Sequence, residues 1–284
     1  MTEPHSHTLD AFGAVLHYDV RNGPEPTLLI VGSPMGAAGF VTLAGHFADR
    51  RVVTYDPRGA ERSRRTDAAD ENSVEEHADD LHRLIDAVGG PVDVFASSGG
   101  AVNALALVAR HPEQVRMLVA HEPPASAELP DADAVIKVCV DIRDTYLSAG
   151  FGPAMAKFIA LVSHQGPVTE DYLAQPAPDP AAFGLPTEDD GNRDDPLLKL
   201  NMVTCNAFEH DFDALRAAPT RIVIGVGADS GETLAARAGR AVAEKLGTDP
   251  VVFPGDHGGF LGGEYGQTGK PEEFAAVLRG VLAS

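Results

Sequence analysis

Short apolar runs alternate with longer stretches of helical periodicity, and this alternation constrains the fold more than any other feature of the sequence. The runs lead into loops rich in Gly, Pro, Asp or Ser, as buried strands of parallel sheets do. Such alternation is typical of a mostly parallel sheet with crossover helices. The predicted strands are Thr27–Val31, Arg51–Tyr55, Val92–Ala96, Met117–Ala120, Arg221–Val226 and Val251–Phe253.

An antiparallel hairpin and four helices complete this core. Thr8–Val20, with a turn at Phe12-Gly13, reads as a hairpin at the sheet edge, so we expect eight strands in all. Ser73-Val-Glu-Glu76 is a capping box that opens the first helix. The other predicted core helices are Gly99–Arg110, Thr233–Leu246 and Pro271–Leu282.

One long segment, residues 123–219, contains no strand-like run. It carries helical patterns at 132–149, 153–164 and 196–215, with a Pro/Asp/Gly-rich stretch at 175–195. Ligands bind at the carboxyl edge of open α/β sheets. We therefore expect a helical cap at 123–219, inserted after strand 6 over that edge, and a core made of residues 1–122 and 220–284.

The segment Val94-Phe-Ala-Ser-Ser-Gly-Gly100 is the most informative one for function. It runs from a predicted buried strand into a helix of small residues, with Ala96, Ser98 and Gly100 in a small-x-nucleophile-x-small pattern. In such a sharp turn the central residue takes a strained conformation, exposes its hydroxyl and tolerates only small neighbours. Ser98 is therefore the candidate nucleophile, although a plain strand-to-helix turn has the same composition.

Two further segments supply a base and an acid. His257 lies in the Gly-flanked loop Phe253-Pro-Gly-Asp-His-Gly-Gly-Phe260, after the last strand and before the terminal helix. Asp229 follows the penultimate strand, where a carboxylate can fix the imidazole tautomer of a catalytic histidine. Glu122, in His121-Glu-Pro-Pro124, is the alternative acid, and Asp229 is favoured by chain order.

The order Ser98, Asp229, His257, each after a strand, resembles the α/β-hydrolase superfamily over nearly the whole chain. The loop Tyr55-Asp-Pro-Arg-Gly59 is similar to one that many of these hydrolases carry, and we interpret Asp56 and Arg58 as structural. Together with Gly-Ser-Pro-Met-Gly and His-Glu-Pro-Pro, the pattern looks like serine hydrolases common in actinobacteria, of esterase or enol-lactonase type.

The resemblance also implies an oxyanion hole made of backbone N–H groups. Gly99 supplies one donor, and Val31-Gly-Ser-Pro-Met-Gly36 supplies the other from Ser33 or Met35, because Pro34 has no N–H. Met35 is slightly favoured, since Met-Gly resembles the donor-Gly pair of enol-lactonase-like relatives.

These residues predict a cofactor-free serine hydrolase that cleaves a small apolar ester, lactone or thioester. A serine nucleophile argues against epoxide hydrolases and haloalkane dehalogenases, which use a carboxylate. Non-hydrolytic chemistry on the same fold, such as perhydrolysis, acyl transfer or C–C cleavage, remains open, and so does a non-catalytic ligand-binding protein. Apolar cap positions such as Met155 and Phe158 are expected to pack the cap and to wall a substrate pocket.

Charge and composition limit the classes of partner that the chain is expected to bind. The 284 residues carry 22 Lys+Arg against 42 Asp+Glu, a net charge of −20, so nucleic acid and anionic membrane surfaces are not expected partners. Cys139 and Cys205 form no metal motif or disulfide framework, so we expect no metal and a reducing cytoplasm. Met1–His7 lacks the features of a signal peptide, and no apolar run is long enough to span a bilayer.

Two lesser expectations concern quaternary structure and the other histidines. A small-molecule substrate is the predicted partner, and a homodimer is left open. His77 and His82 are placed on the polar side of the first core helix, and His210 is interpreted as a solvated histidine at a helix end.

Overall fold

The computed structural model describes residues 3–284. Residues 1–2, which begin the segment tested above for a signal peptide, lie outside the described residues. A nine-stranded sheet has the order β1-β2-β4-β3-β6-β7-β8-β9, with the short strand β5 paired to β2. The strands are β1 (His5–Ala11), β2 (Ala14–Arg21), β3 (Leu28–Val31), β4 (Val52–Tyr55), β5 (Arg64–Arg65), β6 (Val92–Ser97), β7 (Val115–His121), β8 (Arg221–Gly227) and β9 (Val251–Phe253).

The predicted α/β architecture is confirmed, including the hairpin and the parallel order of the central strands. β1 pairs antiparallel with β2, and β2 pairs antiparallel with β4. Neighbouring strands in the remaining part of the sheet pair in parallel, in the order β4-β3-β6-β7-β8-β9. The ninth strand is β5, two residues that the sequence pattern did not predict. Such a short pair has no periodicity of its own.

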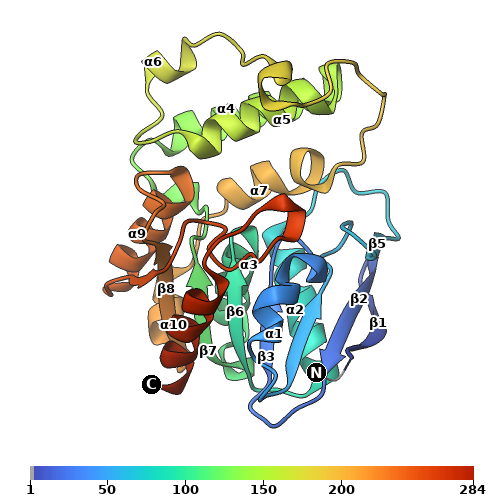
Figure 1. Ribbon diagram of the computed structural model, residues 1–284, viewed down its shortest axis with the longest axis vertical. Coiled ribbons are helices and arrows are strands. Elements are labelled where there is room, and N and C mark those ends of the chain that lie inside the picture. Colours follow the sequence, from blue (N-terminus) through green and yellow to red (C-terminus); the bar gives the residue numbers. More distant parts are fainter. Residues whose placement is uncertain (1–2) are drawn as a thin grey trace.

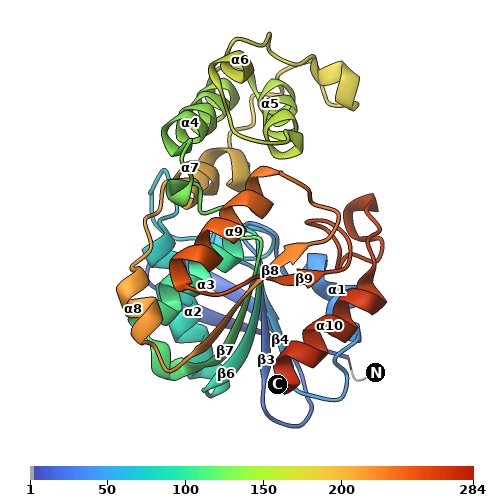
Figure 2. The same cartoon turned by 90° about the vertical axis from the view of Figure 1, so that its left-hand side faces the viewer.

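Helices cover both faces of the sheet (Figure 2). One face packs against α2 (Val74–Val88), α3 (Gly99–Arg110), α8 (Phe212–Ala217) and α9 (Leu234–Leu246), and the other against α1 (Val41–Gly45) and α10 (Pro271–Ala283). Short 3-10 turns lie at η1 (Ala37–Phe40), η2 (Pro112–Gln114) and η6 (Glu264–Gly266). These two apolar layers hold the strand ends at one common edge.

A set of helices, which we call the cap, lies over the carboxyl ends of the strands (Figure 1). It contains η3 (Ser126–Glu128), α4 (Ala132–Ala149), α5 (Phe151–Ser163), α6 (Glu170–Leu173), η4 (Pro180–Phe183), the π-helical turn η5 (Pro196–Asn201) and α7 (Met202–Asn206). α4 and α5 share an apolar cluster with Met202 of α7 and with Leu234 and Ala238 of α9. In contrast, α8 packs on the core through Leu215, although the sequence grouped it with the insertion. Within residues 3–284, every helix is too short or too polar to cross a bilayer.

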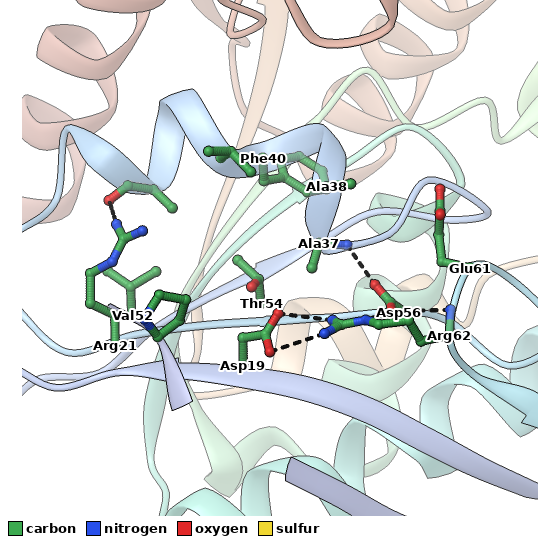
Figure 3. Close-up of a pocket in the computed structure, with 13 residues that line it drawn as sticks. Asp19, Arg21, Ala37, Ala38, Phe40, Val52, Thr54, Asp56, Glu61 and Arg62 are labelled. Carbon is green, nitrogen blue, oxygen red and sulfur yellow. Dashed lines mark hydrogen bonds and ion pairs between the residues drawn. The ribbon is translucent and has the colours of Figure 1, made fainter. Parts of the chain in front are cut away.

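Charged groups fix the loop after β4. The Asp56 carboxylate accepts a hydrogen bond from the Ala37 N–H (2.9 Å) and binds Arg62, whose guanidinium also binds Asp19 (2.8 Å). Figure 3 shows these groups around a small pocket of ≈ 290 Å³, which lies beneath η1. The network matches the structural interpretation of Asp56.

Arg58 is the second anchor of this loop. Its side chain is 1% exposed and its guanidinium pairs with both oxygens of Asp80 at 2.7 Å, while a third bond reaches Glu76 at 2.6 Å. The guanidinium is thus satisfied by carboxylates in the interior, as a buried charge must be. This geometry matches the structural interpretation of Arg58.

Two histidines lie elsewhere than the sequence pattern predicted. His77 is 2% exposed, and its Nε2 lies 2.7 Å from Asn201 Oδ1, because η5 reaches over the face of α2 that was expected to be solvated. His210 is 8% exposed between Phe208 and Phe212, and neither ring nitrogen has a partner within residues 3–284. Both corrections arise from tertiary packing that a helical pattern does not encode.

Burial of His210 makes stability pH-dependent. Burial lowers the pKa of His210 from 6.5 to about 4, so between these values the unfolded chain binds a proton that the folded chain does not. The free energy of unfolding therefore falls as the pH falls from 6.5 to 4, by up to about 3 kcal/mol for this residue. We predict that His210→Leu flattens this part of the pH dependence in denaturant titrations.

A matched control is Ile85→Val, which removes a buried methylene from the core cluster against which Phe208 and Phe212 pack and leaves the contacts of His210 in place. It lowers the free energy of unfolding at every pH and leaves the slope unchanged. An unchanged slope in His210→Leu would show that His210 is protonated in the folded protein.

Candidate active site

Ser98 stands at the sharp turn between β6 and α3. Its backbone has φ 56° and ψ −132°, in the left-handed half of the map that non-glycine residues rarely adopt. The Ser98 N–H donates to the His121 carbonyl (3.0 Å), and the Ala101 N–H donates to the Ser98 carbonyl (2.9 Å). Strain of this kind persists only where the surroundings impose it, and it is common at functional sites.

The two glycines after Ser98 are required by close packing. A Cβ on Gly100 would lie 2.7 Å from the Val31 carbonyl oxygen and 2.8 Å from Gly32 Cα, and a Cβ on Gly99 would lie 2.6 Å from the Ser33 carbonyl oxygen. These neighbours are backbone atoms of the β3 strand and the loop after it, which have little freedom to move. The small-residue pattern seen in the sequence is therefore a packing requirement of the turn.

His257 is paired with Glu122. The imidazole Nδ1 lies 2.7 Å from Glu122 Oε2, and the Gly227 N–H donates to Glu122 Oε1 (2.8 Å). The Glu122 side chain is fully buried, whereas that of His257 is 44% exposed. Glu122 follows directly after β7 with φ 45°, a second non-glycine residue in the left-handed region.

The Glu122 carboxyl is held in its ionised form. Burial by itself would raise its pKa, but the hydrogen bond from His257 and the attraction of that imidazole lower the pKa from 4.5 to about 2. An ionised carboxylate only accepts hydrogen bonds, so His257 Nδ1 carries a proton and Nε2 of the neutral ring keeps a lone pair. The pair thus presents a base at Nε2.

Asp229 does not make the contact expected of it, and the structure corrects this prediction. Its carboxylate pairs with Lys270 Nζ at 2.7 Å, and both side chains are more than half exposed. The physical reason is position, because β8 ends at Gly227 and Asp229 lies two residues farther along a solvated loop. Gly227 meanwhile directs its N–H to Glu122.

Sheet register explains why Glu122 is well placed. Ser97 in β6 is paired with His121 in β7, so the next residues, Ser98 and Glu122, leave neighbouring strands at the same level. β8, which leads to Asp229, is one strand farther from β6. Glu122, the alternative acid in the sequence analysis, therefore follows a strand that lies nearer to the turn at Ser98 than the strand before Asp229 does.

Ser98 and His257 line one cavity of ≈ 590 Å³ beneath the cap. Its apolar wall comes from the cap helices and includes the predicted position Phe158, while Met155 packs within the cap cluster. Within residues 3–284, no cluster of three or more His, Cys, Asp or Glu side chains could hold a metal ion. Other cap side chains on this wall are Leu161, Val162, Leu197 and Met202.

The loop after β3 brings Ser33 rather than Met35 to the cavity. Ser33, Pro34 and Gly99 line it, and Gly99 lies directly against Ser33. The Met35 side chain instead packs with the apolar cluster behind the sheet, close to Gly39. The slight preference for Met35 is therefore not supported by the geometry.

His121 is a further residue near His257 that the sequence analysis did not place at the site. Its ring is fully buried, stacks on His257 with 6.1 Å between centroids, and places Nδ1 3.3 Å from Ser97 Oγ. Burial lowers the pKa of His121 to about 3, so the ring is neutral and adds no charge beside Glu122. The pairing of β6 with β7 is the signal that links it to the turn.

Comparison with known proteins identifies the family. A family model described as alpha/beta hydrolase fold matches residues 26–179. The chain belongs to the α/β-hydrolase fold family. It is 32% identical over 264 residues to the uncharacterized hydrolase YraK of Bacillus subtilis (strain 168), with 89% of each chain covered. These findings place it among the hydrolases of that fold.

Solved structures agree on the fold. The esterase EaEST from Exiguobacterium antarcticum superposes with a TM-score of 0.68 at 16% identity, over 99% of this chain and 100% of that one. The enol-lactonase from Burkholderia xenovorans LB400 gives 0.65 at 15% identity, over 98% and 100%. At such low identity the likeness concerns the path of the chain and says nothing of the substrate.

The packing of the turn yields a stability prediction. Gly100→Ala forces a methyl group against backbone atoms of the β3 strand and should lower the free energy of unfolding by about 1–3 kcal/mol. Gly280→Ala is the matched control, because nothing lies within 4 Å of its Cβ and alanine favours the interior of α10 by about 1 kcal/mol. Urea unfolding of the two variants measures both effects, and equal stabilities would contradict the packing described here.

Proposed function

We propose that this member of the α/β hydrolases is a cofactor-free serine hydrolase that cleaves a carboxylic ester, lactone or thioester through an acyl-enzyme. The observation that carries the proposal is the His257–Glu122 pair, whose imidazole lines the same cavity as the strained Ser98. A base held by a buried carboxylate, in the same cavity as a serine at a sharp turn, is the arrangement that nucleophilic catalysis requires.

In the first half of the reaction Ser98 Oγ attacks the carbonyl carbon. His257 Nε2 takes the hydroxyl proton and then donates it to the leaving alcohol or thiol, while the ester oxygen or sulfur departs with the bonding pair. Glu122 stays ionised and stabilises the imidazolium through Nδ1–H. In the second half, water repeats the attack on the acyl-enzyme and the serine hydroxyl is restored.

The negative charge that develops on the carbonyl oxygen needs donors already in place. We assign this role to the backbone N–H groups of Gly99 and Ser33, which belong to adjacent segments that line the cavity. Gly99 begins α3, so its N–H belongs to the free N-terminal donors of that helix and benefits from the helix dipole. Fixed donors of this kind are often the largest single contribution to catalysis.

The walls of the cavity favour a small, largely apolar substrate without an anionic group. Phe158, Leu161 and Met202 supply apolar surface from the cap, and the charged side chains of Asp229 and Asp256 are acidic. Among the described residues that line the cavity none is Lys or Arg. The net charge of −20 also disfavours the approach of anions.

The covalent role of Ser98 is tested by removing its hydroxyl. Ser98→Ala should abolish labelling by a fluorophosphonate and lower kcat for an aryl ester by several orders of magnitude, because no acyl-enzyme can form. The melting temperature should stay within a few degrees or rise. Turnover within about tenfold of the wild type would contradict the assignment.

The choice of acid is tested by two amide substitutions. Glu122→Gln keeps the shape but cannot stabilise the imidazolium or hold the correct tautomer, so kcat should fall by about 10⁴. Asp229→Asn only removes an exposed ion pair with Lys270 and should change kcat by less than about tenfold. Steady-state kinetics on the folded variants measure both, and the reverse ranking would restore Asp229 as the acid.

A further inference from the structure

The cavity has a polar wall on the side of α2 and α3 that the proposed reaction does not use. His77 and Asn103 line it, and each side chain is only 2% exposed. His77 Nδ1 and Asn103 Nδ2 have no hydrogen-bond partner within residues 3–284. Buried polar atoms without partners are costly, so both are candidates for contacts with a bound molecule.

The hydrogen bonds around His77 determine what it can accept. Asn201 Nδ2 donates to the Pro196 carbonyl (2.8 Å), which fixes the amide so that Asn201 Oδ1 faces His77 Nε2 at 2.7 Å. His77 Nε2 must therefore carry the proton. Burial lowers the pKa of His77 to about 4, so the neutral ring has a bare lone pair at Nδ1 and accepts one hydrogen bond.

Asn103 supplies the complementary donor. It follows Gly99 by four residues in α3, so the two residues lie on the same face of the helix, and both line the cavity. The unpartnered Nδ2 is a pure donor. The wall thus combines an acceptor on α2 with a donor on α3, and these two helices pack against each other.

We propose that this wall is a specificity subsite for an uncharged polar group of the substrate, such as a hydroxyl or an amide, that donates to His77 and accepts from Asn103. The absence of Lys and Arg from the described lining disfavours a carboxylate or phosphate there. The proposal rests on the proposed hydrolase function and adds to it the substrate class, namely hydroxylated or amide-bearing small esters and lactones.

Pairs of esters that differ by one group test the subsite. Phenyl 3-hydroxybutanoate is compared with phenyl 3-methylbutanoate for the acyl side, and 4-hydroxybutyl acetate with pentyl acetate for the alcohol side. In at least one pair the wild-type enzyme should favour the hydroxyl by roughly 10- to 100-fold in kcat/KM, because the methyl group leaves buried polar atoms unpaired.

Two variants locate the preference and one controls for general cavity effects. Asn103→Leu and His77→Phe should each reduce the preference for the hydroxyl by roughly tenfold, mainly by lowering kcat/KM for the hydroxylated ester. Val162→Ala, an apolar cap position on the same cavity, should change both members of a pair equally. If one variant fails to fold, the other and the wild-type ratios decide.

The two proposals fail separately. Ester hydrolysis with no preference for the hydroxyl in either pair, or a preference unchanged in both variants, overturns the subsite and leaves the hydrolase. If no ester is hydrolysed, the hydrolase proposal fails, and calorimetric titration of Ser98→Ala with the same pairs still tests the subsite. Tighter binding of the hydroxylated ester supports it, and equal binding overturns it.

Discussion

The whole site depends on the close contact between the turn at Ser98 and the end of β3. Ser98 is held at φ 56°, a conformation that costs about 1–3 kcal/mol and must be imposed by its neighbours. Gly99 and Gly100 allow this because they have no Cβ and can therefore lie against backbone atoms of Val31, Gly32 and Ser33. The same contact places Ser98 on the wall of the cavity, where α3 begins, and brings Gly99 against the Ser33 carbonyl group.

The second requirement is a carboxylate that stays ionised while buried. Glu122 meets it with one hydrogen bond from His257 and one from the Gly227 N–H, and these offset the cost of burial. Asp229 lies in a more solvated place, where its charge is balanced by Lys270. Sheet register, through the pairing of Ser97 with His121, puts the buried carboxylate one strand from Ser98.

Local patterns in the sequence were enough for most of the fold and for the choice of two candidate site residues, Ser98 and His257. Apolar runs and helical periodicity predicted the strands and helices, because these signals are carried by neighbouring residues. The motifs around these two candidates are short and have strict steric demands, so they can be recognised from neighbouring residues alone. β5 was missed, since two residues carry no period.

The remaining features depend on contacts between distant segments. Glu122 and Asp229 both follow strands, and only the burial of one and the solvation of the other separates them. His77 was assigned to a solvated face because its cover, Asn201, lies 124 residues away in the chain. His210 was misplaced although Phe208 and Phe212 are only two residues away from it, because these two rings are themselves packed against the folded core.

The central claim is that an acyl group passes through Ser98. Its most direct test is peptide mapping by mass spectrometry after rapid acid quenching of the wild-type enzyme mixed with an aryl carbamate, whose carbamoyl-enzyme loses its acyl group slowly. We predict one carbamoyl group per chain on the peptide that contains Ser98, formed as the phenol is released. A carbamoyl group on another residue, or release of the phenol with no modified peptide, would contradict it.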